Sequence, residues 1–297
     1  MRFAVTGGSG LVGRAIVRRL ALDHEVVNID IAAGQRDGSA SGTREIRPGS
    51  VEHSPTDVTD LPKLCVALRG ADVIVHAAGI PGPTFATEHE IMEVNVEGTR
   101  NVGLAAAAES IGRIVFVSSE AVLGFVFSKG AVRPRYLPVD ESHPLAPAEP
   151  YGRSKLLAEA ALARSAPRDS SVVCLRPPWV WTPEEFDKLR ELTRDPGRWW
   201  DGLWAYVHGD DLALAVELAA TRDLDAGVHA AYVVAPDNGT ERPTRELVRE
   251  HYPGVPVDPG LEEFGSLISS GGLRDLVGFA PEMRWREFLP TGGGRDA

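Results

Sequence analysis

The first thirty residues constrain the fold of this chain more than any other stretch. An apolar strand over residues 2–5 runs directly into the glycine-rich turn Thr6–Gly13, and the helix that follows spaces its apolar residues for one buried face. A second apolar strand over 25–29 then ends on Asp30. Glycines let the turn reverse tightly and let the backbone approach a pyrophosphate at the helix N-terminus, and the acid can accept hydrogen bonds from a ribose. This order of elements indicates a dinucleotide-binding unit.

The same alternation of strands and helices continues along the chain. Further strands are predicted over 71–76, 113–117, 172–175 and 229–234, and helices over 61–69, 87–110, 151–163 and 210–221. This predicts an α/β fold, a doubly wound parallel sheet covered by helices on both faces. Ligands of such sheets bind beyond the carboxyl ends of the strands, which here carry Thr6, Asp30, His76, Ser118 and Arg176. We therefore expect the site at this edge, with His76 itself in a structural role.

Composition narrows the expected partners. The chain has 297 residues, 42 acidic against 31 basic side chains and a formal charge of −11, which argues against a nucleic-acid or anionic-membrane partner. Its two cysteines, Cys65 and Cys174, are expected to be core thiols in a reducing compartment. The sequence has no membrane-length apolar stretch and no metal-ligand spacing, and we expect no signal peptide. These features predict a cytoplasmic protein with a small-molecule substrate, no metal, and a homodimer as an open option.

Tyr151 and Lys155 indicate the chemistry. Their spacing of four residues on a predicted helix places both side chains on one face. A lysine ammonium near a phenol favours the phenolate and is expected to lower the tyrosine pKa. Tyr151 can then act as a base toward a hydroxyl or as an acid toward a carbonyl. Ser119, at the end of a neighbouring strand, can hydrogen-bond the same oxygen.

These segments together resemble the extended short-chain dehydrogenase/reductase superfamily, in its branch of NAD-dependent epimerases and dehydratases. The resemblance covers nearly the whole chain. The matching pieces are Thr6–Gly13, Asp57–Asp60, His76–Gly79, Asn95–Thr99, Val117–Gly124, Tyr151–Lys155, Leu175–Pro177 and, more weakly, Tyr206–Ala213.

The resemblance implies roles for individual residues. Tyr151 is implied as the catalytic acid/base, Lys155 as its partner and a nicotinamide-ribose ligand, and Ser119 as the catalytic serine. Asn95 is implied to support the site lysine or a bound water. The expected cofactor-binding residues are Gly7, Gly10, Leu11, Val12, Gly13, Asp30, Asp57, Val58, Ala77, Ala78, Gly79, Asn95, Val117, Tyr151, Lys155 and Pro178.

Departures from the family pattern bear on the substrate. Leu123 stands where many sugar-nucleotide epimerases have tyrosine, and the arginine expected before Tyr206 is absent. The segment between Arg176 and Tyr206 is also much shorter than in epimerases that hold a nucleoside diphosphate. It resembles the shorter dehydrogenases of free sugars and uronic acids. The expected substrate wall consists of Ser119, Glu120, Arg176, Trp179, Glu184 and Trp200.

Residues 1–176, completed by 209–235, are expected to form the NAD-binding domain, and 177–208 with 236–297 a small substrate lobe. The expected function is NAD-dependent hydride transfer at a hydroxyl carbon of a sugar, sugar acid or polyol. Asp30 should repel the 2′-phosphate of NADP, although Arg36 could weaken that preference. Two alternatives stay open. One is a sugar or nucleotide-sugar epimerase/dehydratase without net redox. The other is an NAD(P)-sensing regulator, which has no need of the Ser-Tyr-Lys set.

Overall fold

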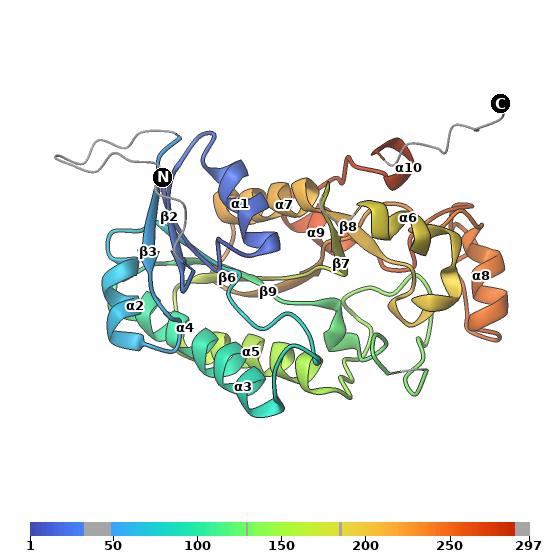
Figure 1. Ribbon diagram of the computed structural model, residues 1–297, viewed down its shortest axis with the longest axis horizontal. Helices are drawn as coiled ribbons and strands as arrows, with labels where there is room; N and C mark the ends of the chain where they lie inside the picture. Colours follow the sequence, from blue (N-terminus) through green and yellow to red (C-terminus); the bar gives the residue numbers. More distant parts are fainter. Residues whose placement is uncertain (33–48, 129, 184–185, 289–297) are drawn as a thin grey trace.

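A parallel sheet forms the centre of the protein in the computed structural model, which describes residues 1–32, 49–128, 130–183 and 186–288 (Figure 1). Within these residues the main sheet has seven strands in the order β3-β2-β1-β4-β5-β6-β9. Its strands are β1 (Arg2–Thr6), β2 (Glu25–Asp30), β3 (Val51–Pro55), β4 (Val73–His76), β5 (Arg113–Val117), β6 (Ser171–Arg176) and β9 (Gly227–Tyr232). Every neighbouring pair is parallel, so the carboxyl ends of the strands share one edge.

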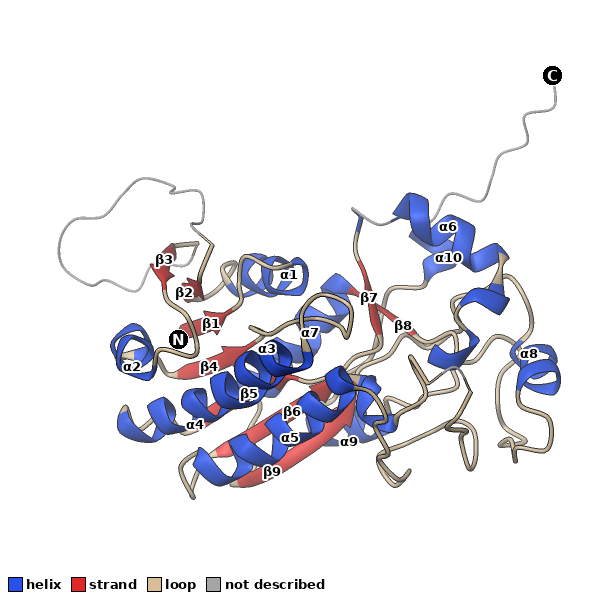
Figure 2. Cartoon of the chain, turned by 60° about the horizontal axis from the view of Figure 1, so that its bottom comes forward, coloured by secondary structure: helices blue, strands red, loops and turns tan. Residues whose placement is uncertain are grey.

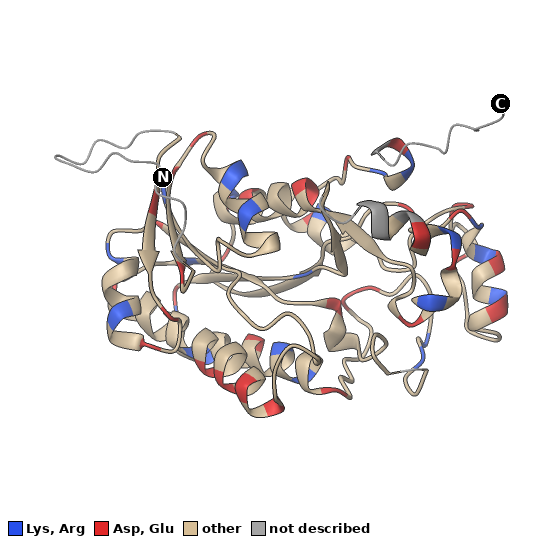
Figure 3. Ribbon diagram, in the orientation of Figure 1, with Lys and Arg blue, Asp and Glu red and all other residues tan. Residues whose placement is uncertain are grey.

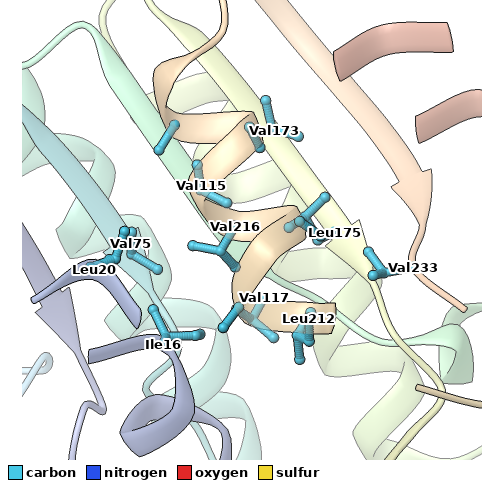
Figure 4. Close-up of a cluster of buried hydrophobic side chains, with 14 of the residues drawn as sticks. Ile16, Leu20, Val75, Val115, Val117, Val173, Leu175, Leu212, Val216 and Val233 are labelled. Carbon is cyan, nitrogen blue, oxygen red and sulfur yellow. The ribbon is translucent and has the colours of Figure 1, made fainter. Parts of the chain in front are cut away.

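Helices cover both faces of the sheet (Figures 1 and 2). One face carries α1 (Leu11–Leu20), α7 (Gly209–Thr221) and α9 (Gly271–Val277), and the other carries α2 (Leu61–Leu68), α4 (Gly98–Ala108) and α5 (Pro150–Ser165). On the first face Ile16 and Val216 point at the strand valines, as Figure 4 shows for one buried cluster. The predicted doubly wound α/β fold is therefore confirmed.

The predicted helix over 87–110 is interrupted by a π-helical segment. It consists of α3 (Glu88–Met92), the π segment η1 (Glu93–Glu97) and α4. Thr87 and Glu90 cap the start of α3 reciprocally, each side chain accepting from the other residue's backbone N–H. Exposed acidic residues recur along α3 and η1, as the red segments of the ribbon show (Figure 3). Single π turns occur frequently at functional sites, and this one carries the buried Asn95.

The second core lies beyond the carboxyl edge of the sheet. The elements around it are β7 (Trp179–Trp181), α6 (Phe186–Arg194), η4 (Pro196–Arg198), η5 (Trp200–Gly202), β8 (Tyr206–His208), α8 (Thr244–His251) and α10 (Trp285–Phe288). The parallel pair β7–β8 and the tryptophans Trp181, Trp199 and Trp204 bury their side chains there. We call this region the substrate lobe. By contrast, α9 packs with the sheet, and the two-part division of the chain stays a prediction.

The short strands β7 and β8 were not predicted, and two strands of the main sheet, β3 and β9, also differ from the sequence expectation. β3 pairs with β2 at the sheet edge although its residues are mostly polar, and β9 begins two residues before the predicted start at 229. A solvent-facing edge strand lacks the apolar run that marks a buried one, so its pairing is decided by the neighbouring strand. Among the described helices, none combines the length and apolar character needed to cross a membrane.

Candidate active site

The glycine turn lies where the strand order of the sheet reverses. β1 lies between β2 and β4, and Thr6 at the end of β1 is in register with His76 at the end of β4. Gly7 has a φ of 72°, and a Cβ there would lie 2.5 Å from the backbone N of Ala78. A side chain at Gly13 would collide with the carbonyl oxygen of Gly7. These positions therefore need glycine, and they bring the turn and the end of β4 together at the crevice where such sheets bind ligands.

The turn and the tip of β2 have the chemistry of a dinucleotide cradle. α1 follows Gly10 directly, and among the described residues no side chain caps its N-terminus. A Cβ on Gly10 would meet only the Gly7 carbonyl, at 3.3 Å, so that side of the turn is open. Asp30 is oriented by backbone N–H groups of Ser9 (3.0 Å) and Ala32 (2.9 Å), which donate to its carboxylate. Free helix N–H groups and an oriented acid suit a pyrophosphate and a ribose, respectively.

The other expected cofactor residues lie along the same edge. Leu11 and Val12 open α1, while Ala77, Ala78 and Gly79 follow β4 and Val117 ends β5. Asp57 forms a turn in which its side chain accepts from Thr59, and Val58 is buried against Gly98. Pro178 is buried between β6 and β7.

Ser119, Tyr151 and Lys155 meet beside this cradle. Tyr151 lies in the first turn of α5, where Glu149 caps the helix by accepting from the backbone N–H of Tyr151 (2.7 Å) and of Gly152. Ser119 accepts from Ala121 N (3.1 Å), and its side chain lies close enough to the Tyr151 phenol to act on the phenol pKa. Sequence reasoning missed Glu149, although a helix-start acid followed by proline is a cap signal.

The expected lowering of the Tyr151 pKa is wrong for this arrangement. Burial raises the pKa of Tyr151 to about 12, and the nearby Ser119 side chain opposes part of that shift. The Nζ of Lys155 lies 5.9 Å from the centre of the Tyr151 ring and donates to Val117 O at 3.0 Å. Burial also lowers the pKa of Lys155 to about 8. Tyr151 is therefore held as a neutral phenol, the form that donates a proton to a carbonyl.

Asn95 connects the π segment to the catalytic helix. Its side-chain oxygen accepts from Ile80 N (2.7 Å), and its Nδ2 donates to Ser154 Oγ (2.9 Å). Ser154 in turn donates to the carbonyl oxygen of Tyr151 (2.7 Å). A Cβ on Gly79 would be 2.9 Å from Asn95 Oδ1 and 3.6 Å from Lys155 Nζ, so asparagine and lysine border the same small space. Asn95 thus positions the start of α5 and the loop after β4.

His76 extends this network in one defined tautomer. Thr99 donates its hydroxyl hydrogen to Asn95 O at 2.5 Å, so its oxygen must accept from His76 Nε2 at 2.8 Å. His76 Nδ1 then accepts from the Thr6 hydroxyl at 2.6 Å. Burial, with a smaller effect from Lys155, lowers the pKa of His76 to about 3. The expected structural role of His76 fits this neutral, doubly bonded ring.

We predict that His76 stays neutral, with the proton on Nε2, throughout the neutral and mildly acidic range. As pH falls from 6.5 toward about 3, His76 binds a proton in the unfolded chain but not in the folded protein. The free energy of unfolding should therefore decrease over that pH range. Nitrogen NMR of the imidazole rings checks both statements, with exposed His89 as an internal reference. A His76 ring that titrates near 6.5 would contradict the tautomer and the network.

Arg176, expected in the substrate wall, is paired with a buried acid. It is buried at the end of β6, and its Nε and terminal nitrogen donate to the two carboxylate oxygens of Glu159 at 3.0 and 2.7 Å. Ser118 also donates to Glu159 at 2.6 Å. The charge of the guanidinium is therefore balanced inside the protein by Glu159, and the pair joins β6 to α5. The place of Arg176 in the substrate wall stays a prediction. Glu159, four residues beyond Lys155, was not singled out from the sequence.

The other expected wall residues are divided between the site and the lobe core. Ser119 and Glu120 lie at the catalytic edge, in front of and within η2 (Glu120–Leu123). Trp179 is half-buried on β7 and meets the Trp199 ring edge-on at 6.0 Å. Trp200 stacks on His251 at 5.7 Å. Glu184 and Arg36 lie outside the described residues.

Comparisons with known proteins agree with this geometry. The profile of the 3-beta hydroxysteroid dehydrogenase/isomerase family matches residues 4–195. L-arabinose 1-dehydrogenase (NAD(P)(+)) of Haloferax volcanii is 34% identical over 209 residues, covering 68% of this chain and 76% of that protein. A Stigmatella aurantiaca protein, 4-hydroxy-2-methyl-3-oxo-4-farnesyl-3,4-dihydroquinoline-1-oxide ketoreductase, is 35% identical over 236 residues, covering 75% of this chain and 65% of its own.

A solved structure shares the fold. A short-chain dehydrogenase/reductase superfamily protein from Agrobacterium tumefaciens, with bound NAD, superimposes with a TM-score of 0.69 at 23% identity, covering 97% of this chain and 95% of that one. The resemblance inferred from the motifs is therefore confirmed. This chain belongs to the 3-beta hydroxysteroid dehydrogenase/isomerase family within the extended short-chain dehydrogenase/reductase superfamily, and is an enzyme of its NAD-dependent dehydrogenase/epimerase type.

Proposed function

We propose that this chain is a dehydrogenase that transfers hydride between NAD and a hydroxyl carbon of a free sugar, sugar acid or polyol. The observation that carries the proposal is the meeting of Ser119, Tyr151 and Lys155 at the sheet edge that also holds the glycine turn. A sugar substrate is supported by the similarity to an L-arabinose 1-dehydrogenase. The intact set of three side chains argues against a sensor without turnover.

Each side chain of the set has one task in this reaction. Ser119 and Tyr151 hold the substrate oxygen between them, and Tyr151 exchanges its proton with that oxygen. Lys155, whose pKa burial lowers to about 8, lies near the phenol ring and the end of β5, where its amine can bind the nicotinamide ribose. Bound nicotinamide supplies the hydride acceptor or donor. The glycine turn and the free N-terminus of α1 would hold the pyrophosphate of this dinucleotide, and Asp30 would hold its adenosine ribose.

We predict a preference for NAD over NADP. Asp30 is held at the tip of β2 by two backbone N–H groups, and an acid at this place in such folds repels a 2′-phosphate while accepting hydrogen bonds from a ribose hydroxyl. Catalytic efficiency with NAD should exceed that with NADP by about tenfold or more, and Asp30→Asn should reduce this ratio. The exposed variant Asp23→Asn is the matched control for the loss of one charge. An NADP preference in the unmodified protein would remove this role from Asp30.

We also predict that the substrate has no nucleotide attached. The short segment between Arg176 and Tyr206 fills the lobe with its own aromatic side chains, among them buried Trp181, Trp199 and Trp204. A nucleoside diphosphate needs a long cleft with cationic groups, and Arg176 is already paired. Calorimetric titration with UDP and UDP-sugars in the presence of NAD should show no binding in the micromolar range. Tight binding of UDP would favour the epimerase alternative.

The reaction itself is tested with purified protein, NAD and a panel of aldoses, polyols and sugar acids, following the absorbance of reduced cofactor. Net reduction of NAD by at least one member of the panel is the expected result. Interconversion of two sugars without net reduced cofactor would identify an epimerase instead. Reduction of an apolar ketone by NADH, with no sugar oxidised, would move the chain toward the ketoreductase relative.

A further inference from the structure

A buried carboxyl group stands beside the catalytic serine without a partner. Glu120 directly follows Ser119, and only 7% of its surface is exposed. Its backbone N–H donates to Pro177 O at 2.9 Å. No hydrogen bond or ion pair joins its carboxyl group to another side chain or backbone group in the described part of the chain. Burying a carboxyl group without a partner is unfavourable, and a ligand that reaches this group can supply the missing hydrogen bonds.

The carboxyl group of Glu120 faces the substrate lobe. A Cβ on Gly202, in η5, would lie 3.8 Å from Glu120 Oε1. Burial and the neighbouring Asp201 raise the pKa of Glu120 well above its ordinary value. Its charge also acts on Tyr151 and on Tyr252 of the lobe, raising the pKa of each phenol. Glu120 therefore lies between the acid/base and the lobe, where the rest of a substrate bound at Tyr151 must extend.

The described cations around this space are engaged by other groups. Glu159 holds Arg176, and Lys155 donates to a carbonyl at the end of β5. Arg133 lies on the exposed rim, 5.9 Å from the centre of the Tyr252 ring, and donates to a carbonyl of α8. Two acidic residues, Glu120 and Asp201, thus border the space between η2 and η5, and no described cationic side chain points into it.

Building on the dehydrogenase function above, we propose that Glu120, with Asp201 behind it, selects the substrate by hydrogen-bonding a hydroxyl of a neutral sugar and excluding sugars that carry a carboxylate. A protonated carboxyl group both donates and accepts, as a hydroxyl does, so the two groups can satisfy each other. The burial and the acidic neighbour Asp201 that raise the pKa of Glu120 also disfavour any further carboxylate placed there. Of the sugar classes left open by the sequence, the neutral sugars fit this site and the sugar acids do not.

The test compares three sugars with the same ring configuration, using the full chain with NAD. L-Arabinose, D-galactose and D-galacturonate differ only in the substituent at one ring carbon, which is hydrogen, hydroxymethyl or carboxylate. We expect kcat/KM for galactose to exceed that for galacturonate on the order of 100-fold. Glu120→Gln keeps the shape and removes the acid, and should narrow this ratio about tenfold. Glu246→Gln, at an exposed position of the lobe helix α8, should leave the ratio unchanged.

Three results would overturn the inference. Equal or better use of galacturonate by the unmodified protein would do so while leaving the dehydrogenase function intact. An unchanged ratio in a folded Glu120→Gln protein would remove Glu120 as the selecting group, with thermal unfolding as the check on folding. If that variant does not fold, Asp201→Asn decides, because it should narrow the same ratio by a smaller factor. Failure to oxidise any of the three sugars would refute the sugar dehydrogenase function and this inference together.

Discussion

Replacing Tyr151 by phenylalanine is expected to lower kcat by about 10² to 10⁴-fold, since a positioned proton donor contributes that much to a rate. The phenol is buried, neutral and close to Ser119, so the substitution removes one hydroxyl without opening a cavity. Cofactor affinity should change little, because the cradle at the glycine turn and Asp30 is untouched. Steady-state kinetics with the best sugar of the panel and fluorescence titration with NADH measure the two quantities separately.

The control for this substitution is Tyr136→Phe. Tyr136 donates to Asp140 at 2.7 Å in the loop before α5 and has no part in the proposed reaction. The Tyr136→Phe variant also loses one phenol hydroxyl, and its kcat should equal that of the unmodified protein. Near-normal turnover by Tyr151→Phe would show that another group moves the proton.

Breaking the buried pair of Glu159 and Arg176 should produce the largest loss of stability. Their side chains are 10% and 7% exposed and share two hydrogen bonds, so Glu159→Gln leaves a guanidinium buried without its counter-charge. Removing one member of such a pair lowers the free energy of unfolding by about 3–5 kcal/mol. The melting temperature should fall on the order of 5–10 °C, as measured by calorimetry or circular dichroism.

Two variants separate this effect from the loss of a negative charge alone. Glu241→Gln removes the acid of an exposed pair with Arg194, whose side chains are 58% and 65% exposed, and should change stability by less than about 1 kcal/mol. The double variant Glu159→Leu with Arg176→Met should recover part of the loss, because apolar side chains do not need a partner in the interior. A melting temperature unchanged in Glu159→Gln would show that Arg176 finds water or another acceptor.

The residues of the first prediction could be identified from the sequence, whereas the pairing behind the second could not. Tyr151 and Lys155 could be paired from spacing alone, because a helix places residues four apart on one face. Arg176 was assigned to the substrate wall because it ends a strand, as Asp30 and Ser118 do. Its actual partner is Glu159, on a helix whose packing against β6 is a tertiary contact. No local pattern distinguishes an arginine that faces a ligand from one that faces a buried acid.

Local patterns determined the doubly wound sheet, the glycine turn with its acid at the tip of β2, and the edge at which Ser119, Tyr151 and Lys155 meet. These depend on periodicity, on glycine's freedom at Gly7 and on parallel strands ending together. Tertiary structure alone decided the pairing of β3, the π turn at Asn95, the single tautomer of His76 and the partner of Arg176. It also reversed the direction expected for the Tyr151 pKa. The reason is that burial and the direction of a hydrogen bond depend on which segments surround a group, and those segments are far apart in the chain.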